Sequence, residues 1–306
     1  MIDFARFNNI KLRAAGLGEV LFDVFESGAS LGGAPANFAY HCCQLGLECV
    51  VVSAVGRDEF GQRARRELEQ AGLKLMLYEN GYPTGDVQIK LDDQGVATYD
   101  FRKDTAYDHL PFDEDLAAVA AQTNLACYGS LAQRGPDTAR SIRRFIESMP
   151  ADLSVKVFDV NLRQNYYSKE MIEDTLKLSN VFKCNEDELP VLAKLLGMPN
   201  EPEAFYRTLS SAFGIDLFIY TLGGEGSAVY LGNEYSRKVS QKVRVVDTVG
   251  AGDSFTASLL TGLMVGMPLA EAHERAVAIS AYVCTCAGAM PPMPAELTAP
   301  FKQKLL

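Results

Sequence analysis

The second half of the chain alternates between short apolar runs and longer segments in which apolar residues recur at helical spacing. This alternation predicts a mostly parallel sheet with helices on both faces. The predicted strands lie at 154–160, 181–184, 217–222, 226–231 and 234–246, and the predicted helices at 169–179, 187–196 and 201–213. Two charge-free apolar stretches, 254–270 and 276–295, follow as buried helices. Prolines 291, 292 and 294 end the second one before it could cross about 30 Å of hydrocarbon.

The first half has a different pattern. Residues 13–25 and 82–101 read as strands, with turns at 26–28, 83–85 and 92–95. Between them, 36–45 and 61–71 read as helices that flank a buried strand, 49–55. Strand-rich segments beside an α/β core predict a small β-sheet that packs over the core edge as a lid. It is formed from roughly 13–31 and 82–105.

Composition narrows the classes of function. The chain has 306 residues and a net charge of −10. This balance excludes a general binder of nucleic acid or of an anionic membrane, although it allows a local pocket for ATP. Seven cysteines without a C-x-x-C motif and only three histidines argue against a zinc site. The cysteines are therefore expected to be reduced thiols in a cytoplasmic protein. Residues 1–13 lack the apolar segment of a signal peptide.

The segment 247–255, Asp-Thr-Val-Gly-Ala-Gly-Asp-Ser-Phe, carries the strongest chemical signal, since it lies between a strand and a long apolar helix. Glycines 250 and 252 allow the backbone to approach a ligand, and a helix start offers N–H groups to an anion. A carboxylate there, Asp253, fits a base that takes a proton from an attacking hydroxyl during phosphoryl transfer. The alternative is that Asp253 only caps the helix.

Three weaker motifs accompany it. Gly32-Gly33 followed by Asn37 offers amides to a small polar ligand, although a plain turn and helix cap is an alternative. Asn185 and Glu188 share one helical face after a strand and fit a magnesium–water–phosphate network. An acidic first helical turn is the alternative reading of the latter pair. The segment 221–226 follows a buried strand at the carboxyl end, where open α/β sheets bind ligands. No P-loop or complete dinucleotide fingerprint is present.

With these residues in view, the sequence resembles the ribokinase-like (PfkB-type) carbohydrate kinase family over roughly 15–293. One signature runs from Gly32 through Asn37 to Gly46 and Gly56, and the other covers 247–260. The resemblance implies a single kinase domain over 1–306. Its fold would be a three-layer α/β/α core with a central mostly parallel sheet and a small β-sheet lid. The family's lid often also forms a dimer interface, which implies a homodimer here.

The resemblance also assigns roles to residues. Asp253 matches the catalytic base, and the amides of Gly250, Ala251 and Gly252 match the anion hole over the γ-phosphate. Asn185 and Glu188 match a motif that binds phosphate and, through water, Mg²⁺. The remaining matches are the nucleotide-lining residues Thr221, Gly223 and Gly226 and the sugar-binding residues Asp23, Gly32, Gly33 and Asn37. Val277 stands where related kinases have Asn beside the nucleotide, which leaves the nucleotide preference and a K⁺ site open.

Within the family, the segments 18–23, 159–163 and 287–294 look like those of fructokinases. Arg102 and Arg163 occupy positions where fructokinases and 2-keto-3-deoxygluconate kinases carry arginines, and in the latter these can bind the substrate carboxylate. The alternative for both is solvated surface or a salt bridge to a neighbouring acid. We therefore expect an ATP- and Mg²⁺-dependent kinase for a hydroxymethyl group of a small sugar, with fructose the first candidate. The alternatives are a 2-keto-3-deoxygluconate, pentose or nucleoside kinase, or a non-catalytic sugar sensor on the same fold.

Overall fold

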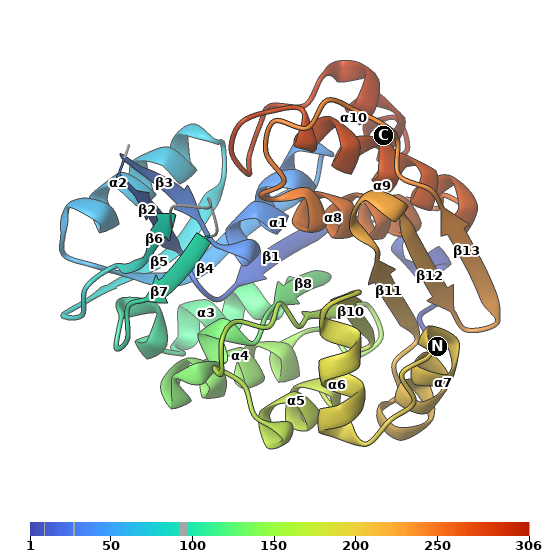
Figure 1. Cartoon of the computed structure of the whole chain (residues 1–306), viewed down its shortest axis with the longest axis horizontal. Coiled ribbons are helices and arrows are strands. Elements are labelled where there is room, and N and C mark those ends of the chain that lie inside the picture. Colours follow the sequence, from blue (N-terminus) through green and yellow to red (C-terminus); the bar gives the residue numbers. More distant parts are fainter. Residues whose placement is uncertain (9, 27, 92–96, 306) are drawn as a thin grey trace.

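A nine-stranded sheet runs through the centre of the protein (Figure 1). The computed structural model describes residues 1–306 except 9, 27, 92–96 and 306. The central strands are β1 (Arg13–Leu17), β4 (Glu48–Gly56), β5 (Lys74–Asn80), β8 (Leu125–Tyr128), β9 (Val155–Asp159), β10 (Val181–Asn185), β11 (Leu217–Thr221), β12 (Ser227–Leu231) and β13 (Glu234–Lys238). Their order is β13-β12-β11-β10-β9-β8-β1-β4-β5. Only the β11–β12 and β12–β13 pairs are antiparallel, so the predicted mostly parallel sheet is confirmed.

Helices cover both faces of this sheet, which gives three layers (Figure 1). One layer holds α1 (Ala34–Gln44), α2 (Glu59–Gln70), α8 (Ala251–Met264), α9 (Leu269–Cys284) and α10 (Ala295–Lys302). The other holds α3 (Glu114–Ala120), α4 (Pro136–Ser148), α5 (Lys169–Leu176), α6 (Glu188–Leu196) and α7 (Pro202–Phe213). Successive side chains of a strand point to opposite faces. Ala14 and Leu125 accordingly join the first apolar cluster, while Ala15 and Ala126 join the second.

A separate four-stranded sheet forms the predicted small sheet. Its strands are β2 (Leu21–Phe25), β3 (Gly28–Gly32), β6 (Gly85–Leu91) and β7 (Ala97–Phe101), in the order β3-β2-β6-β7. Phe22 of β2 stacks on Phe60 of α2 with ring centroids 4.4 Å apart, which anchors this small sheet to the core. At its other end, Arg134 donates a 2.6 Å hydrogen bond to the Arg102 carbonyl and pairs with Asp108 at 2.8 Å.

The structure corrects several predicted boundaries. Residues 13–25 are not one strand, because β1 lies in the middle of the central sheet and only β2 belongs to the small one. Gly18, with φ +143°, lies in the break where the chain leaves the core. The strand expected at 234–246 ends at Lys238, and the helix expected at 276–295 is the second part of α9 and ends at Cys284. The turn at 92–95 lies outside the described residues.

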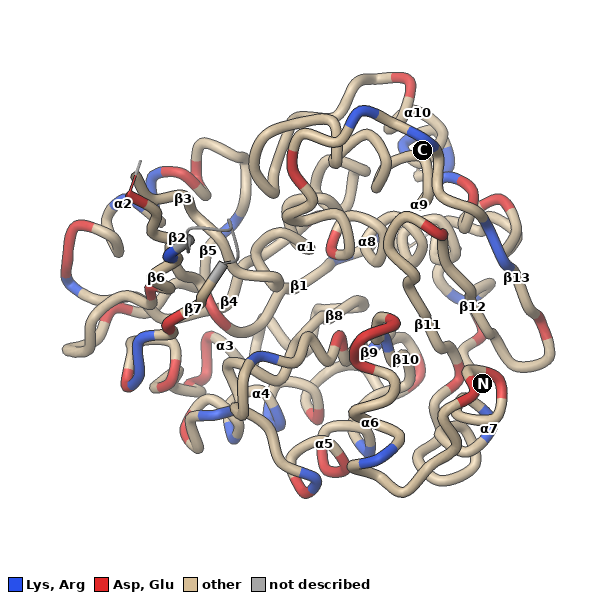
Figure 2. The backbone as a smooth tube through the Cα atoms, viewed as in Figure 1, with Lys and Arg blue, Asp and Glu red and all other residues tan. Residues whose placement is uncertain are grey.

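Charged residues of both signs are interspersed along the trace (Figure 2). Many of the basic residues pair with neighbouring acids on the surface, as Arg207 does with Glu203 and Arg275 with Glu271. Within the described part of the chain, no helix has both the length and the apolar character needed to cross a bilayer. The apolar stretches of the sequence are accounted for by α8 and α9, which lie in the core.

Candidate active site

Asp253 lies in the first turn of α8, at the carboxyl ends of the central strands. Gly250, in the left-handed conformation with φ +78°, caps this helix, so the interpretation of Asp253 as the N-cap is wrong. The Asn37 side chain donates a 2.8 Å hydrogen bond from Nδ2 to Asp253 Oδ2. This contact joins α1 to α8 across 216 residues of sequence. It brings the two signature motifs together at one carboxylate, and Asn37 is therefore more than part of a plain turn.

The first turn of α8 also presents backbone N–H groups that have no partner within the helix. The Ala251 N–H donates to the Thr248 carbonyl at 3.2 Å. The Gly250 and Gly252 amides are therefore better placed than that of Ala251 to receive an anion. A Cβ atom at Gly252 would lie 3.2 Å from Lys183 Nζ, so an ammonium group lies directly beside this turn.

Lys183 of β10 is buried and pairs with Asp159 of β9, with Nζ 2.9 Å from Oδ2. Burial opposes its charge, but the carboxylates of Asp159, Glu188 and Asp253 outweigh burial and raise the pKa of Lys183. Burial raises the pKa of Asp253 to about 6, and the nearby Asp159 adds to this effect. Lys183 and the Asn37 hydrogen bond oppose the rise. At neutral pH Asp253 is therefore ionised, and it is a much better proton acceptor than an ordinary aspartate.

The predicted nucleotide-side residues line one cleft of about 390 Å³ beside this turn. Val277, which stands where related kinases have Asn, also lines this cleft. Gly226 has φ +114°, and a Cβ atom there would lie 2.0 Å from the Lys238 carbonyl oxygen, so only glycine fits. The cleft brings together Asn185, Thr221, Gly223, Gly226, Ala251 and Gly252, together with Lys183.

Asn185 and Glu188 form a hydrogen-bonded brace at the start of α6. Glu188 Oε1 accepts from the Leu162 N–H at 2.7 Å, and Oε2 accepts from the Asn185 N–H at 2.9 Å. Asn185 Oδ1 in turn accepts from the Glu188 N–H at 2.9 Å. Burial raises the pKa of Glu188, although Lys183 counteracts it. Both carboxylate oxygens already bind backbone, which fits contact with a metal through water better than direct ligation. Among the described residues, no three metal-binding side chains cluster.

The predicted sugar-side residues come from β2, β3 and the start of α1. A Cβ atom at Gly32 would lie 3.0 Å from Asp23 Oδ2, so that carboxylate lies against Gly32, and Gly33 caps α1. Burial raises the pKa of Asp23, while Arg163 lowers it and Asp247 raises it further. Arg163 also acts on Asp253. Asp23 and Arg163 thus belong to the same electrostatic environment as Asp253.

Arg102 does not join this group through any contact among the described residues. Its guanidinium pairs with Asp86 of β6, and Asp86 is buried. The ion pair agrees with the salt-bridge interpretation of Arg102. Arg163, by contrast, lowers the pKa values of Asp23 and Asp253, and its guanidinium donates a hydrogen bond to the Leu162 carbonyl at 3.1 Å.

Three further charged residues of the site were given no role in the sequence analysis: Lys183, Asp159 and Glu19. The first lies inside the run Val181–Asn185 and the second ends the run Val155–Asp159, and a charge that is buried within a strand is itself a signal. Glu19 follows β1, where the chain passes to the small sheet, and its Oε2 atom has no hydrogen-bond partner in the part of the chain that the structure describes. Burial raises the pKa of Glu19 to about 7, with Arg163 opposing and Asp253 reinforcing this shift.

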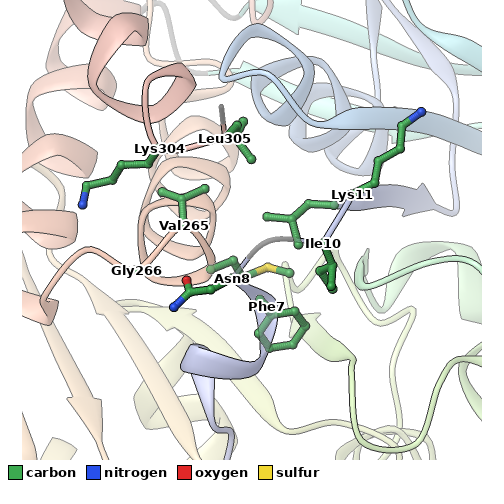
Figure 3. A pocket seen from close by; sticks show the side chains of 10 residues that line it. Phe7, Asn8, Ile10, Lys11, Val265, Gly266, Lys304 and Leu305 are labelled. Atoms are coloured by element: carbon green, nitrogen blue, oxygen red, sulfur yellow. The ribbon is translucent and has the colours of Figure 1, made fainter.

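A larger cavity, of about 780 Å³, lies at the opposite ends of the strands (Figure 3). It is enclosed by the N-terminal segment, the end of α8 and the C-terminal residues. The charged side chains that line it are two lysines, Lys11 and Lys304. Lys11 pairs with Glu48, and both are partly exposed. The two therefore differ in the residues around them. Of the two, the smaller cleft is the one that lies beside buried acids and the start of a helix.

Comparison with known proteins agrees with this geometry. The family model described as pfkB family carbohydrate kinase matches residues 2–296. The chain belongs to the pfkB family of carbohydrate kinases. A fructokinase of Salmonella typhimurium is 30% identical over 278 residues, covering 86% of this chain and 88% of that protein. A fructokinase of Klebsiella pneumoniae is 29% identical over 297 residues, covering 91% and 95%.

Solved structures share the pfkB fold seen here. A fructokinase with bound ATP from Xylella fastidiosa superposes with a TM-score of 0.84 at 22% identity, covering 96% of this chain and 99% of that one. An uncharacterised sugar kinase from Pyrococcus horikoshii in complex with ATP gives 0.81 at 24% identity, covering 96% and 100%. These likenesses confirm the expected ribokinase-like architecture, a central sheet between helical layers with a small separate sheet.

Proposed function

We propose that this pfkB kinase is an ATP-dependent fructokinase that transfers the γ-phosphate to a hydroxymethyl group of fructose. The observation that carries the proposal is the Asn37–Asp253 hydrogen bond of 2.8 Å at the start of α8. It links the sugar-side helix to a carboxylate that lies next to the nucleotide-side cleft. The relatives named fructokinase, at 29% and 30% identity, support fructose as the acceptor.

Asp253 takes the proton of the attacking hydroxyl, and its raised pKa suits this role. The amides of Gly250 and Gly252, together with Lys183, stabilise the charge of the transferring phosphoryl group. The cleft lined by Asn185, Thr221, Gly223 and Gly226 holds the nucleotide. Glu188 would contact, through water, a Mg²⁺ ion bound with ATP, and that ion would neutralise phosphate charge. The assay described below tests whether turnover requires K⁺.

The charged residues of the sugar site indicate whether the substrate is neutral or carries a carboxylate. Asp23, Glu19 and Asp253 all interact with Arg163, which is the positive group that their pKa shifts have in common. Arg102 is already paired with Asp86. An acidic surrounding of this kind suits a neutral polyol, because a carboxylate substrate would add a negative group beside Asp23 and Asp253. This argument favours fructose over 2-keto-3-deoxygluconate, the second candidate, which relies on Arg163 as a carboxylate ligand.

A coupled ADP-release assay with Mg²⁺-ATP tests the proposal, with and without K⁺. The acceptors are fructose, tagatose, ribose, 2-keto-3-deoxygluconate and adenosine. We expect turnover on fructose that is lost in Asp253→Asn. Turnover on the keto acid alone would replace fructose by that substrate. ATP binding without turnover on any acceptor would favour the non-catalytic sugar sensor.

We also propose that two copies associate through the small sheet, which then closes each site as a lid. Phe25 of β2 and Tyr99 of β7 are 41% and 51% exposed on this sheet, so burying them against a second copy would remove apolar surface from water. Light scattering at micromolar concentration tests this proposal. A monomeric mass would contradict it.

A further inference from the structure

The inference concerns one face of α1. Asn37, His41 and Gln44 follow one another at i, i+4 and i+7, so they form a polar stripe along the helix. Each contacts the same C-terminal part of the protein. Asn37 donates to Asp253 at 2.8 Å, His41 Nε2 lies 2.9 Å from the Ala289 carbonyl oxygen, and Gln44 Oε1 accepts from the Met293 N–H at 3.4 Å.

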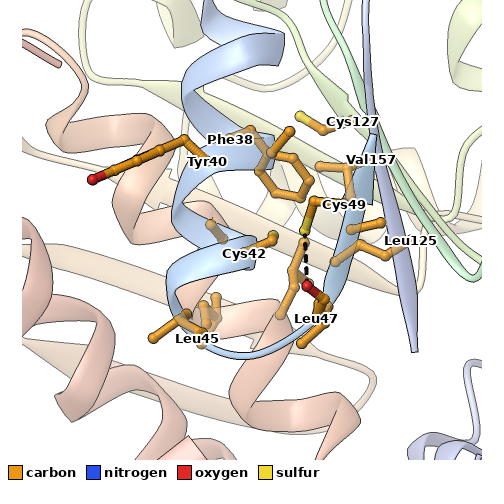
Figure 4. Packing of buried hydrophobic residues seen from close by; sticks show 14 of the residues in the cluster. Phe38, Tyr40, Cys42, Leu45, Leu47, Cys49, Leu125, Cys127 and Val157 are labelled. Carbon is orange, nitrogen blue, oxygen red and sulfur yellow. Dashed lines mark hydrogen bonds between the residues drawn. The ribbon is translucent and has the colours of Figure 1, made fainter. Parts of the chain in front are cut away.

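The neighbouring face of the same helix is apolar. Phe38, Cys42 and Leu45, each one position further along, are buried in the first apolar cluster (Figure 4). The two stripes divide the helix into a packing face and a face that contacts the catalytic segments. His41 is completely buried, with an exposed fraction of 0%, although it lies on the polar stripe. Its burial therefore needs a reason other than filling the core.

The segment that His41 contacts lies directly behind the anion-binding turn. A Cβ atom at Gly250 would lie 2.5 Å from the Ala289 oxygen and 2.8 Å from its Cα. The same segment binds Asp247, whose Oδ2 accepts from the Gly288 N–H at 3.0 Å, while the Val246 N–H donates to the Cys284 carbonyl at 2.8 Å. Residues 284–289 thus form the wall against which residues 246–250 are held.

The hydrogen bond fixes which ring nitrogen is the donor to Ala289. A carbonyl oxygen only accepts, so His41 Nε2 carries a proton. Nδ1 is buried and has no partner among the described residues. Burial lowers the pKa of His41 to about 4, with the Ala289 hydrogen bond opposing the shift, so the ring is neutral at physiological pH. His41 is therefore a fixed donor to one atom and takes no part in proton transfer.

We propose that His41 is a positioning residue which, through Ala289, holds the Gly250–Gly252 turn in register with Asp253. The inference rests on the proposed roles of that turn and of Asp253. One helix then sets both halves of the phosphoryl-transfer geometry, since Asn37 orients the base and His41 supports the wall behind the anion-binding amides. Loosening that wall lowers kcat, because correct placement of the amides counts most when charge develops in the transition state.

The test compares His41→Leu with His41→Gln. Leucine fills the space without a donor, whereas the glutamine amide can reach the Ala289 oxygen as Nε2 does. We expect kcat to fall about tenfold in His41→Leu, the size of one lost hydrogen bond, with KM for sugar and ATP within about threefold. His41→Gln should restore kcat to within about threefold of the wild type. Cys42→Ala, on the apolar stripe, is the matched control: it should lower the melting temperature and leave kcat unchanged.

Three results would overturn the proposal. They are wild-type kcat in folded His41→Leu, an equal loss in His41→Gln, and an equal loss in Cys42→Ala. If His41→Leu does not fold, His41→Asn takes its place, because its shorter amide cannot reach Ala289, and equal kcat in the Asn and Gln variants would overturn the proposal.

A second readout separates this inference from the choice of substrate. We expect His41→Leu to bind the MgADP–aluminium fluoride complex about tenfold more weakly than the wild type, with MgADP affinity unchanged. Unchanged affinity for the fluoride complex would count against His41 whichever sugar is the acceptor. A wild type that ignores fructose would count only against the proposed substrate.

Discussion

The two ends of the central sheet differ in the chemistry that they bury. At the carboxyl ends, Asp159, Lys183 and Glu188 are almost completely buried beside the start of α8. At the amino ends lies the larger cavity, about 780 Å³ against 390 Å³, but its charged groups are two lysines, one of them paired with the partly exposed Glu48. Buried charge is costly and persists where it is used. Between these two ends of the sheet, buried charged side chains therefore identify the active site better than cavity volume does.

The largest expected effect is on turnover when the base is removed. Asp253→Asn should lower kcat by on the order of 10²–10⁴-fold, because the hydroxyl proton loses its acceptor. The same variant should be more stable to urea than the wild type by about 1 kcal/mol or more, since burial disfavours the ionised form of Asp253. Asp152→Asn, an exposed acid that does not line the cleft, is the control and should change neither quantity. Near-full activity in Asp253→Asn would remove the proposed mechanism.

The next effect is on stability. Lys183→Met leaves Asp159 buried without its 2.9 Å partner, which should cost about 3–5 kcal/mol in the free energy of unfolding. Lys177→Met removes a partner of Asp174 at 2.9 Å, where both side chains are more than half exposed, and should cost under about 1 kcal/mol. Urea denaturation measures both. Equal losses would show that the two ion pairs do not differ in the way their burial indicates.

The pH dependence of turnover follows from the raised pKa of Asp253. Protonation removes the base, so kcat/KM, which reports the free enzyme, should fall about tenfold per pH unit below about 6 and stay level above it. A profile of kcat/KM for fructose from pH 4.5 to 8 checks this expectation, with the coupling enzymes in excess at each pH. A value of kcat/KM that stays level down to pH 5 would mean that Asp253 is not the titrating base.

The sequence could predict features that depend on neighbouring residues, but not contacts between residues far apart in the chain. The layered core and the glycine turn before Asp253 follow from local pattern, since helical spacing and turn residues act over a few positions. The Lys183–Asp159 pair joins residues 24 apart that meet only when β9 and β10 align, so no local pattern contains it. The strand predicted over 13–25 was wrong for a related reason. Its two halves are equally apolar, and only tertiary packing assigns β1 to the core and β2 to the small sheet.

A smaller effect separates the two arginines proposed to bind substrate. Arg163→Gln should raise the KM for fructose about tenfold, because it leaves Asp23 and Glu19 without their shared counter-charge. Arg102→Gln leaves the buried Asp86 of the small sheet without its partner and should lower the melting temperature. It should change KM by less than about threefold, because Arg102 contacts none of the predicted sugar-side residues among those described. Steady-state kinetics with fructose decide between them. The reverse order would place the substrate nearer the small sheet than we propose.

The smallest expected effect is at the amino ends of the strands, and it is the sharpest test of the comparison. Lys304→Ala at the larger cavity should leave kcat and KM within about twofold of the wild type, because no buried acid and no helix start lies among the residues that line it. A lysine there is exposed to solvent, where a single charge has little effect on a distant site at physiological ionic strength. If Lys304→Ala instead changed turnover severalfold, the larger cavity would communicate with the carboxyl ends. Burial of charge would then no longer be sufficient to locate the residues on which catalysis depends.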